Sequence, residues 1–335
     1  MHGQWTHALL RAELSSARRR AGELLCLGEA RGERIWQVMG YRCLGVTSFP
    51  LGEFQTACDY LDRGLELFDP TRRSAFNQWT VDDVQIVMMY YSSWALLYLG
   101  HLDQARQRCD AALAEARRLA QPYTLAHTLI ASTLIRLMLE AYEDAQQLLA
   151  EVLTVAEEHG ISYFKVVGTL FHGRCLVELQ CPHEAIERLT RSLAFYRASG
   201  SSLYLPTFLT YLAEAYKKAG QTQQAMERLA EATEIVERTE TRCDEADMYR
   251  LKGELQAMTG DPTGAEGSFR KSLAVAHRQS ARLFELRAAI SLAQLWSDHA
   301  RHAAARDLVM SVRHRFTEGF DTAPLQKAQQ MLGLI

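Results

Sequence analysis

The stretch Gly260–Phe269, GDPTGAEGSF, places three glycines within eight residues, between two segments with helical sequences. A glycine-rich turn that opens onto a helix can hold a phosphate group, because the free backbone N–H groups at a helix start attract anions. The chain contains no G-x-x-x-x-G-K-[S/T] sequence, the pattern of a nucleotide-binding P-loop. The stretch is therefore either an irregular phosphate site or a corner between two packed helices.

Eleven histidines raise the question of a metal site. His299 and His302 are three residues apart, but they lie on either side of a predicted turn and no Cys/His pair accompanies them. His172 and Cys175 share one face of a predicted helix, yet His172 adjoins a position where two helices pack. A zinc site needs three or four converging ligands. We therefore predict no metal site and no cofactor.

The acidic pairs Asp82-Asp83 and Glu157-Glu158 consist of adjacent residues. On a helix their side chains point in different directions, so the two carboxyl groups of a pair would not share a proton. No G-x-S-x-G sequence marks a nucleophile elbow. We predict no catalytic residues and no enzyme activity, and we expect the chain neither to bind nor to hydrolyse ATP.

The composition argues against a nucleic-acid-binding or membrane protein. The chain has 335 residues, of which 37 are basic and 40 acidic, and this balance does not indicate a nucleic-acid or membrane surface. The short basic run at Arg18–Arg20 is diluted by Glu13, Glu23 and Glu29. No apolar run approaches the roughly 20 residues that cross a bilayer. Seven cysteines without a C-x-x-C pair are typical of a reducing compartment, so we predict a cytoplasmic helical protein.

An internal repeat of about 40 residues runs through the whole chain, and it explains the glycine-rich stretch. Steps of 40 residues from Ala265, with one step of 48, reach only alanines: Ala17, Ala57, Ala105, Ala145, Ala185, Ala225, Ala265 and Ala305. The eight extra residues of the long step fall in 68–83, which we interpret as an inserted loop. Fixed periods of this kind indicate stacked helical hairpins.

Two further columns keep the same register. Twelve residues before the alanines stand small residues, namely Gly45, Ser93, Thr133, Gly173, Ala213, Gly253 and Ala293. Eight residues after the alanines the chain mostly has leucine, which we expect to be buried between neighbouring hairpins. Between the columns, Gly100, Gly220 and Gly260 suit the left-handed position that ends a helix. These patterns favour the interpretation of GDPTGAEGSF as a hairpin corner.

Small residues at these two positions are typical of tetratricopeptide repeats, although the usual repeat has 34 residues. The repeat length resembles that of the maltose-type, ATP-dependent transcriptional activators. Longer phrases resemble the C-terminal tetratricopeptide region of large bacterial predicted ATPases and adenylate/guanylate cyclase-type regulators: YYSSWALLYLGHLDQA, LAEAYKKAGQTQQAMERLAEA, EADMYRLKGELQ, LFELRAAISLAQLW and FTEGFDTAPLQKAQQML. The resemblance implies an ATPase or cyclase domain upstream of this region, and says nothing of catalysis within it.

We therefore predict an all-α, tetratricopeptide-like right-handed superhelix of about eight hairpins over residues 1–320. A capping helix should follow over 321–335, with Asp321 as its N-cap and Pro324 in its first turn. At the other end, Trp5 occupies the small position of the first hairpin and that helix has room for only about ten residues. We interpret this end as cut or degenerate.

The first helix of each hairpin should line the concave groove of such a superhelix. The predicted groove residues lie one position after the small column, or one helical turn before or after such a position. They are Tyr90, Trp94, Tyr98, Leu134, Arg174, Glu214, Arg250 and Glu254. The three aromatic residues form a stripe at i, i+4 and i+8 that fits either a groove or a helix core. The charged residues are harder to place in a core, because unpaired charges are costly to bury.

Two functions remain open from the sequence. The first is a non-catalytic scaffold that binds a protein or an extended peptide in the groove, as the sensor or docking module of an ATPase- or cyclase-type regulator. The second is a repeat domain that senses a small molecule in a groove pocket. A closed, aromatic-lined pocket would favour a small ligand, and an open trough would favour a peptide.

Overall fold

The computed structural model describes residues 1–76 and 78–334, and within them the chain is entirely helical. Seventeen α-helices and one 3-10 helix, η1, follow one another: α1 (His2–Leu10), α2 (Leu14–Ala30), α3 (Arg34–Ser48), α4 (Phe54–Leu67), η1 (Pro70–Ala75), α5 (Val84–Leu99), α6 (Leu102–Leu119), α7 (Pro122–Met138), α8 (Tyr142–Glu158), α9 (Ser162–Glu178), α10 (Pro182–Ala198), α11 (Leu205–Lys218), α12 (Thr222–Thr239), α13 (Glu245–Met258), α14 (Pro262–Arg278), α15 (Arg282–Asp298), α16 (His302–Arg313) and α17 (Ala323–Leu334). Helices α1 to α16 form eight antiparallel hairpins, as predicted.

The alanine column lies at the contact between the two helices of each hairpin. All eight alanines are completely buried. Opposite them, a Cβ atom added to Gly45, Gly173 or Gly253 would lie only 2.4–2.6 Å from a side-chain atom of the returning helix. Where the small residue is Ser93 or Thr133, its hydroxyl donates to a carbonyl of its own helix. Small side chains in both columns therefore let the paired helices approach closely, which confirms the predicted register.

The predicted leucine column is only partly correct. Leu113 and Leu193 are buried, but Leu25, Leu65, Leu153 and Leu273 are only half-buried. The residue one position earlier, seven after the alanine, is buried in all eight hairpins. A step of seven residues returns to the same side of a helix more closely than a step of eight does, so the inner position belongs to the seventh residue.

The corner of each hairpin has one recurring backbone conformation. The residue five before each column alanine has a positive φ in all eight hairpins, whether it is glycine, as at Gly260, or another residue, as at Gln180. In GDPTGAEGSF the Asp261 side chain accepts a hydrogen bond of 2.8 Å from the Gly264 N–H. This N–H group at the start of α14 is already bound by the chain itself, and the stretch is a hairpin corner.

The predicted insertion over 68–83 forms η1 and packs against the neighbouring hairpin, although residue 77 lies outside the described residues. Arg73 of η1 contacts the carboxylates of Asp83 and Glu115, each at 2.8 Å. Asp83 also caps α5 by accepting a hydrogen bond from the Ile86 N–H. The segment therefore fixes the start of α5.

The capping helix α17 begins one residue later than predicted. The Gln326 N–H binds the Thr322 carbonyl, so Thr322 is the N-cap residue. Asp321 instead faces Arg106 of α6, with 3.4 Å between the carboxylate and the guanidinium. The prediction of an aspartate N-cap was wrong because this carboxylate pairs across to another helix.

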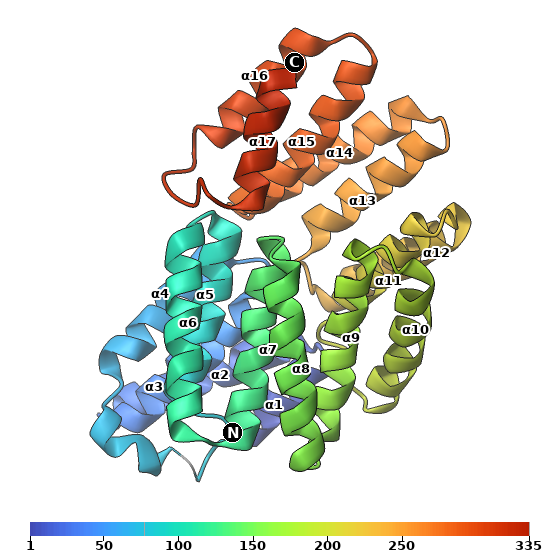
Figure 1. The fold of residues 1–335 in the computed structure, drawn as a ribbon. Helices are drawn as coiled ribbons and strands as arrows, with labels where there is room; N and C mark the ends of the chain where they lie inside the picture. The colour runs from blue at the N-terminus through green and yellow to red at the C-terminus, as the bar shows by residue number, and fades with distance from the viewer. Residues whose placement is uncertain (77, 335) are drawn as a thin grey trace.

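Successive turns of the superhelix touch, which closes its interior. The Ser202 N–H donates to the Leu10 carbonyl at 2.8 Å, and the Arg242 N–H donates to the Pro50 carbonyl at 2.7 Å. A Cβ on Gly100 would lie 2.9 Å from that of Arg282. In each case the end of a first helix meets the start of the first helix, or the segment just before it, of the hairpin five places later. We call these contacts the seam. Figure 1 shows the orange-to-red helices α15 and α17 above the cyan helices α5 and α6, on the two sides of the seam.

The assigned register can be tested with two alanines of α10. Ala185 is completely buried, whereas Ala194 is exposed on the same helix. Ala185→Glu places a charge at a helix–helix contact, so we expect it to lower the free energy of unfolding by about 3 kcal/mol or more. Ala194→Glu should change it by less than about 0.5 kcal/mol. Equal urea midpoints for the two variants would show that the register is wrong.

Candidate functional site

Two adjoining cavities lie inside the closed superhelix, between the first helices of the hairpins. We call the smaller one, of about 50 Å³, the aromatic pocket, and the larger one, of about 230 Å³, the polar pocket. Four residues border both of them: Tyr98, Thr207, Tyr211 and Asp244. The cavities therefore form one continuous interior site with an apolar part and a charged part.

The aromatic pocket is built by side chains from α5, α7, α9 and α11. Trp94 is only 4% exposed, and its indole N–H donates to the Ala131 carbonyl at 3.0 Å. The ring of Tyr98 packs against Phe49 on one side and Phe284 of α15 on the other. Because α15 belongs to the next superhelical turn, the seam itself brings part of this aromatic cluster together.

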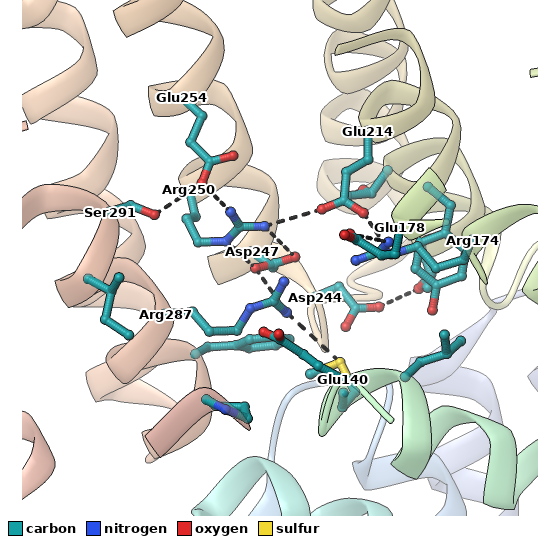
Figure 2. Close-up of a pocket in the computed structure, with 18 of the residues that line it drawn as sticks. Glu140, Arg174, Glu178, Glu214, Asp244, Asp247, Arg250, Glu254, Arg287 and Ser291 are labelled. Carbon is teal, nitrogen blue, oxygen red and sulfur yellow. Dashed lines mark hydrogen bonds and ion pairs between the residues drawn. The ribbon is translucent and has the colours of Figure 1, made fainter. Parts of the chain in front are cut away.

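The polar pocket contains a continuous network of ion pairs, shown in Figure 2. Arg174 of α9 contacts Glu214 of α11 at 2.8 Å, and the other carboxylate oxygen of Glu214 lies 3.3 Å from Arg250 of α13. Arg250 also contacts Asp247 at 2.6 Å and Glu254 at 2.5 Å. One guanidinium thus neutralises carboxylates from two helices.

The network explains how so many charges can be buried. Burial opposes the ionisation of Asp247, but the charges of Arg250 and Arg287 outweigh it and hold the pKa of that carboxyl well below its usual range. Burial likewise opposes ionisation of Glu254, yet Arg250 and Lys217 lower the pKa of Glu254 to about 2. These carboxyl groups are therefore ionised at neutral pH because each faces a cation.

Asp244 is the exception in this pocket. Its carboxylate accepts hydrogen bonds from the hydroxyl groups of Tyr98, at 2.8 Å, and Thr207. Burial raises the pKa of Asp244, against the effect of the Thr207 and Tyr98 hydrogen bonds. Among the described residues it forms no ion pair.

The structure places the predicted groove residues as follows. Trp94, Tyr98 and Leu134 line the aromatic pocket, and Tyr98, Arg174, Glu214, Arg250 and Glu254 line the polar pocket. Tyr90 lines neither pocket, because it is 1% exposed and its hydroxyl contacts His127. Seven of the eight therefore meet at one interior site, which is neither a fully enclosed cavity nor an open trough.

The sequence analysis missed Asp244, Asp247 and Arg287. Asp247 lies one helical turn before Arg250, at i, i+3, which is a spacing that could have pointed to it. Arg287 stands in the same i, i+3 relation to Ile290, which also lines the polar pocket. Asp244 lies outside every repeat column, at the start of α13, and no signal in the sequence marked it.

The described residues form neither a metal site nor a membrane-spanning helix. Across residues 1–76 and 78–334, no three His, Cys, Asp or Glu side chains gather as a metal site. His299 uses its Nδ1 atom to contact the Leu295 carbonyl at 2.7 Å. None of the helices in these ranges is both long and apolar enough to span a membrane.

Comparisons with known proteins give one distant relative of the sequence. No family model matches the chain. An uncharacterised protein of Rhizobium meliloti (strain 1021) is 22% identical over 278 residues, which cover 82% of this chain and 27% of that protein. The chain thus spans about a quarter of the length of this curated relative.

Solved structures resemble the whole fold. A Rap protein complexed with Competence and Sporulation Factor superimposes with a TM-score of 0.63 at 10% identity, over 99% of this chain and 95% of that one. The Rap conjugation gene regulator of plasmid pLS20, in complex with the Phr* peptide, gives 0.61 at 9% identity, over 98% and 95%. NprR in complex with its cognate peptide NprX gives 0.59 at 11% identity, over 99% and 97%.

These likenesses define the class of the fold. The chain is an all-α, tetratricopeptide-like repeat protein, structurally similar to the peptide-bound Rap and NprR structures. This confirms the predicted fold class. The narrower resemblance to bacterial ATPase and cyclase regulators stays a prediction.

The ion-pair network can be tested through Arg250, whose guanidinium contacts three carboxylates. Arg250→Met leaves three buried carboxylates with one cationic partner each instead of two, so we expect it to lower the free energy of unfolding by about 3 kcal/mol at neutral pH. The folded-state pKa of Glu254, about 2, lies below the unfolded value near 4.3. This carboxyl therefore stabilises the fold above about pH 4, and the stabilisation is lost as the pH falls towards 2.

The difference between the parent and Arg250→Met should accordingly shrink between about pH 5 and pH 2, as measured by urea unfolding. Arg191→Met is a matched control, because Arg191 forms an exposed pair with Glu187. It should have little effect at any pH. A constant difference for Arg250→Met across this range would contradict the assigned electrostatics.

Proposed function

We propose that the chain is a non-catalytic sensor or docking module that binds a short, extended peptide inside the superhelix. The observation that carries this proposal is the continuous interior site, where an aromatic pocket adjoins a pocket with paired charges of both signs. The solved structures of similar fold support it, since two of them are complexes with a peptide.

The size of the site decides what can enter. An α-helix with side chains is about 10–12 Å wide, whereas the two cavities measure about 230 and 50 Å³. Cavities of this size favour a ligand thinner than a helix or a folded protein. An extended strand of a few residues fits better, because it can place one side chain in each pocket.

Each pocket would recognise a different part of the peptide. An apolar side chain in the aromatic pocket would leave water at a gain of about 25 cal/mol per Å² of buried surface. The polar pocket offers carboxylates and cationic groups to the main chain and to charged side chains of a peptide. An extended peptide exposes unpaired N–H and C=O groups, which need such partners when they are buried.

A small molecule is the second candidate, and the cavity volume favours it. Ligand pockets of about 300–1,000 Å³ are usual, so the two cavities together lie near the lower end of that range. A closed, aromatic-lined pocket is the feature that we expect of a small-ligand sensor. A longer peptide would require the seam to open.

We further propose that the chain regulates a larger assembly, such as an upstream ATPase or cyclase domain. The resemblance in sequence phrases supports this context. The curated relative also supports it, because nearly three quarters of that protein lie outside the matched region. Binding inside the superhelix would then change the shape that neighbouring domains contact.

The experiment is a selection of random pentapeptides on the immobilised chain, with binding measured by calorimetry. Ser291 of α15 lines the polar pocket, whereas Gln294 on the same helix is exposed and lines neither pocket. Ser291→Trp fills the pocket, so we expect it to weaken the selected peptides by about ten-fold or more. Gln294→Trp should bind them as the parent does.

Equal affinities of the parent and Ser291→Trp would show that the peptides bind elsewhere. Selection of no peptide, together with thermal stabilisation of the parent but not of Ser291→Trp by a pool of small metabolites, would favour the second candidate.

A further inference from the structure

The buried carboxyl groups of the polar pocket differ in one respect. Glu214 faces Arg174 and Arg250, Asp247 faces Arg250 and Arg287, and Glu254 faces Arg250 and Lys217. Near the mouth, Glu178 pairs with Arg174 and Glu140 pairs with Lys327. Among the described residues, Asp244 alone of the carboxyl groups lining this pocket has no cationic partner.

The position of Asp244 is fixed from two sides. Just before it, the N–H groups of Arg242 and Cys243 both bind the Pro50 carbonyl across the seam, at 2.7 and 3.1 Å. Asp244 is the N-cap residue directly before α13, yet its side chain makes no capping hydrogen bond to that helix. The Asp244 side chain instead points into the pocket (Figure 2). There its carboxylate accepts hydrogen bonds from Tyr98 of α5 and Thr207 of α11.

Asp244 borders both pockets. The residue is half-buried and keeps some accessible surface, although its chain neighbours Cys243 and Glu245 are buried. That surface faces the cavities, because Asp244 lines the aromatic pocket and the polar pocket alike. A ligand that spans the two pockets therefore passes this group.

The energetics favour a cation at this point. A buried carboxyl group without a cationic partner is either neutral or costly to ionise. Two hydroxyl donors hold the Asp244 oxygens in place, but they supply no charge. A positively charged ligand group would provide the missing counter-charge in a site of low dielectric, where charge-assisted hydrogen bonds are strongest.

We propose that Asp244 binds a cationic side chain of the peptide, an ammonium or guanidinium group, while an apolar side chain of the same peptide fills the aromatic pocket. This inference rests on the proposed peptide-binding function and specifies its ligand: a peptide that carries lysine or arginine beside an apolar residue.

The test uses three pools of N-acetylated, C-amidated pentapeptides that differ only at the central position. This position holds lysine, arginine or the neutral isostere norleucine, and phenylalanine is enriched at its neighbours. Retention is measured on the immobilised full chain and on Asp244→Asn, which keeps the acceptor for Tyr98 and Thr207 but removes the charge. Glu237→Gln, a change at an exposed carboxyl of α12 that lines neither pocket, is the matched control.

We expect the parent to retain the lysine and arginine pools about ten-fold more than the norleucine pool. Asp244→Asn should lose this advantage while its retention of the norleucine pool and its melting temperature stay unchanged. Glu237→Gln should keep the advantage. Retention of only one cationic pool would identify the cation as ammonium or guanidinium and support the proposal.

Two outcomes would overturn the inference. If all pools bind equally to the parent and are lost on Ser291→Trp, the interior binds peptides but Asp244 does not select a cation. If no pool binds the parent, the peptide-binding function fails and this inference fails with it.

Discussion

The contact between successive turns of the superhelix is the constraint on which the interior depends. About five hairpins complete one turn, so the end of each early first helix meets the start of a later one. An open superhelix would leave the faces of α5 to α15 in water, where their charges would need no partners. Closure removes that water, and each buried charge then has to be neutralised by a neighbour.

The ion-pair network and the aromatic cluster both follow from this closure. Arg250 can neutralise several carboxylates because α11 and α13 lie side by side, and Tyr98 meets Phe284 because the turns of the superhelix touch. The same geometry places Asp244 between the two pockets without a cation. The described residues thus combine a neutralised ion-pair network with one pocket carboxyl group, Asp244, that has no cationic partner among them.

The sequence predicted the repeat well and the interior only in part. The alanine column and the positive-φ corners are local consequences of helix pairing, which recurs in every hairpin, so one chain was enough to find them. The superhelix closes through small rotations that add up from one hairpin to the next, and no single sequence position encodes this closure. For this reason the sequence could not decide whether Trp94 faces the groove or the core of its hairpin. In the structure Trp94 is buried, and it also lines the aromatic pocket. Asp244 was missed because its surroundings are assembled by the seam.

A crystal structure of the chain with a bound lysine-containing pentapeptide tests the central claim most directly. The account predicts electron density for an extended strand inside the superhelix, with the lysine ammonium within about 3 Å of an Asp244 carboxylate oxygen and an apolar side chain among Trp94, Leu134 and Tyr211. Density for the peptide on the outer faces of the even-numbered helices, with the interior unchanged, would contradict it.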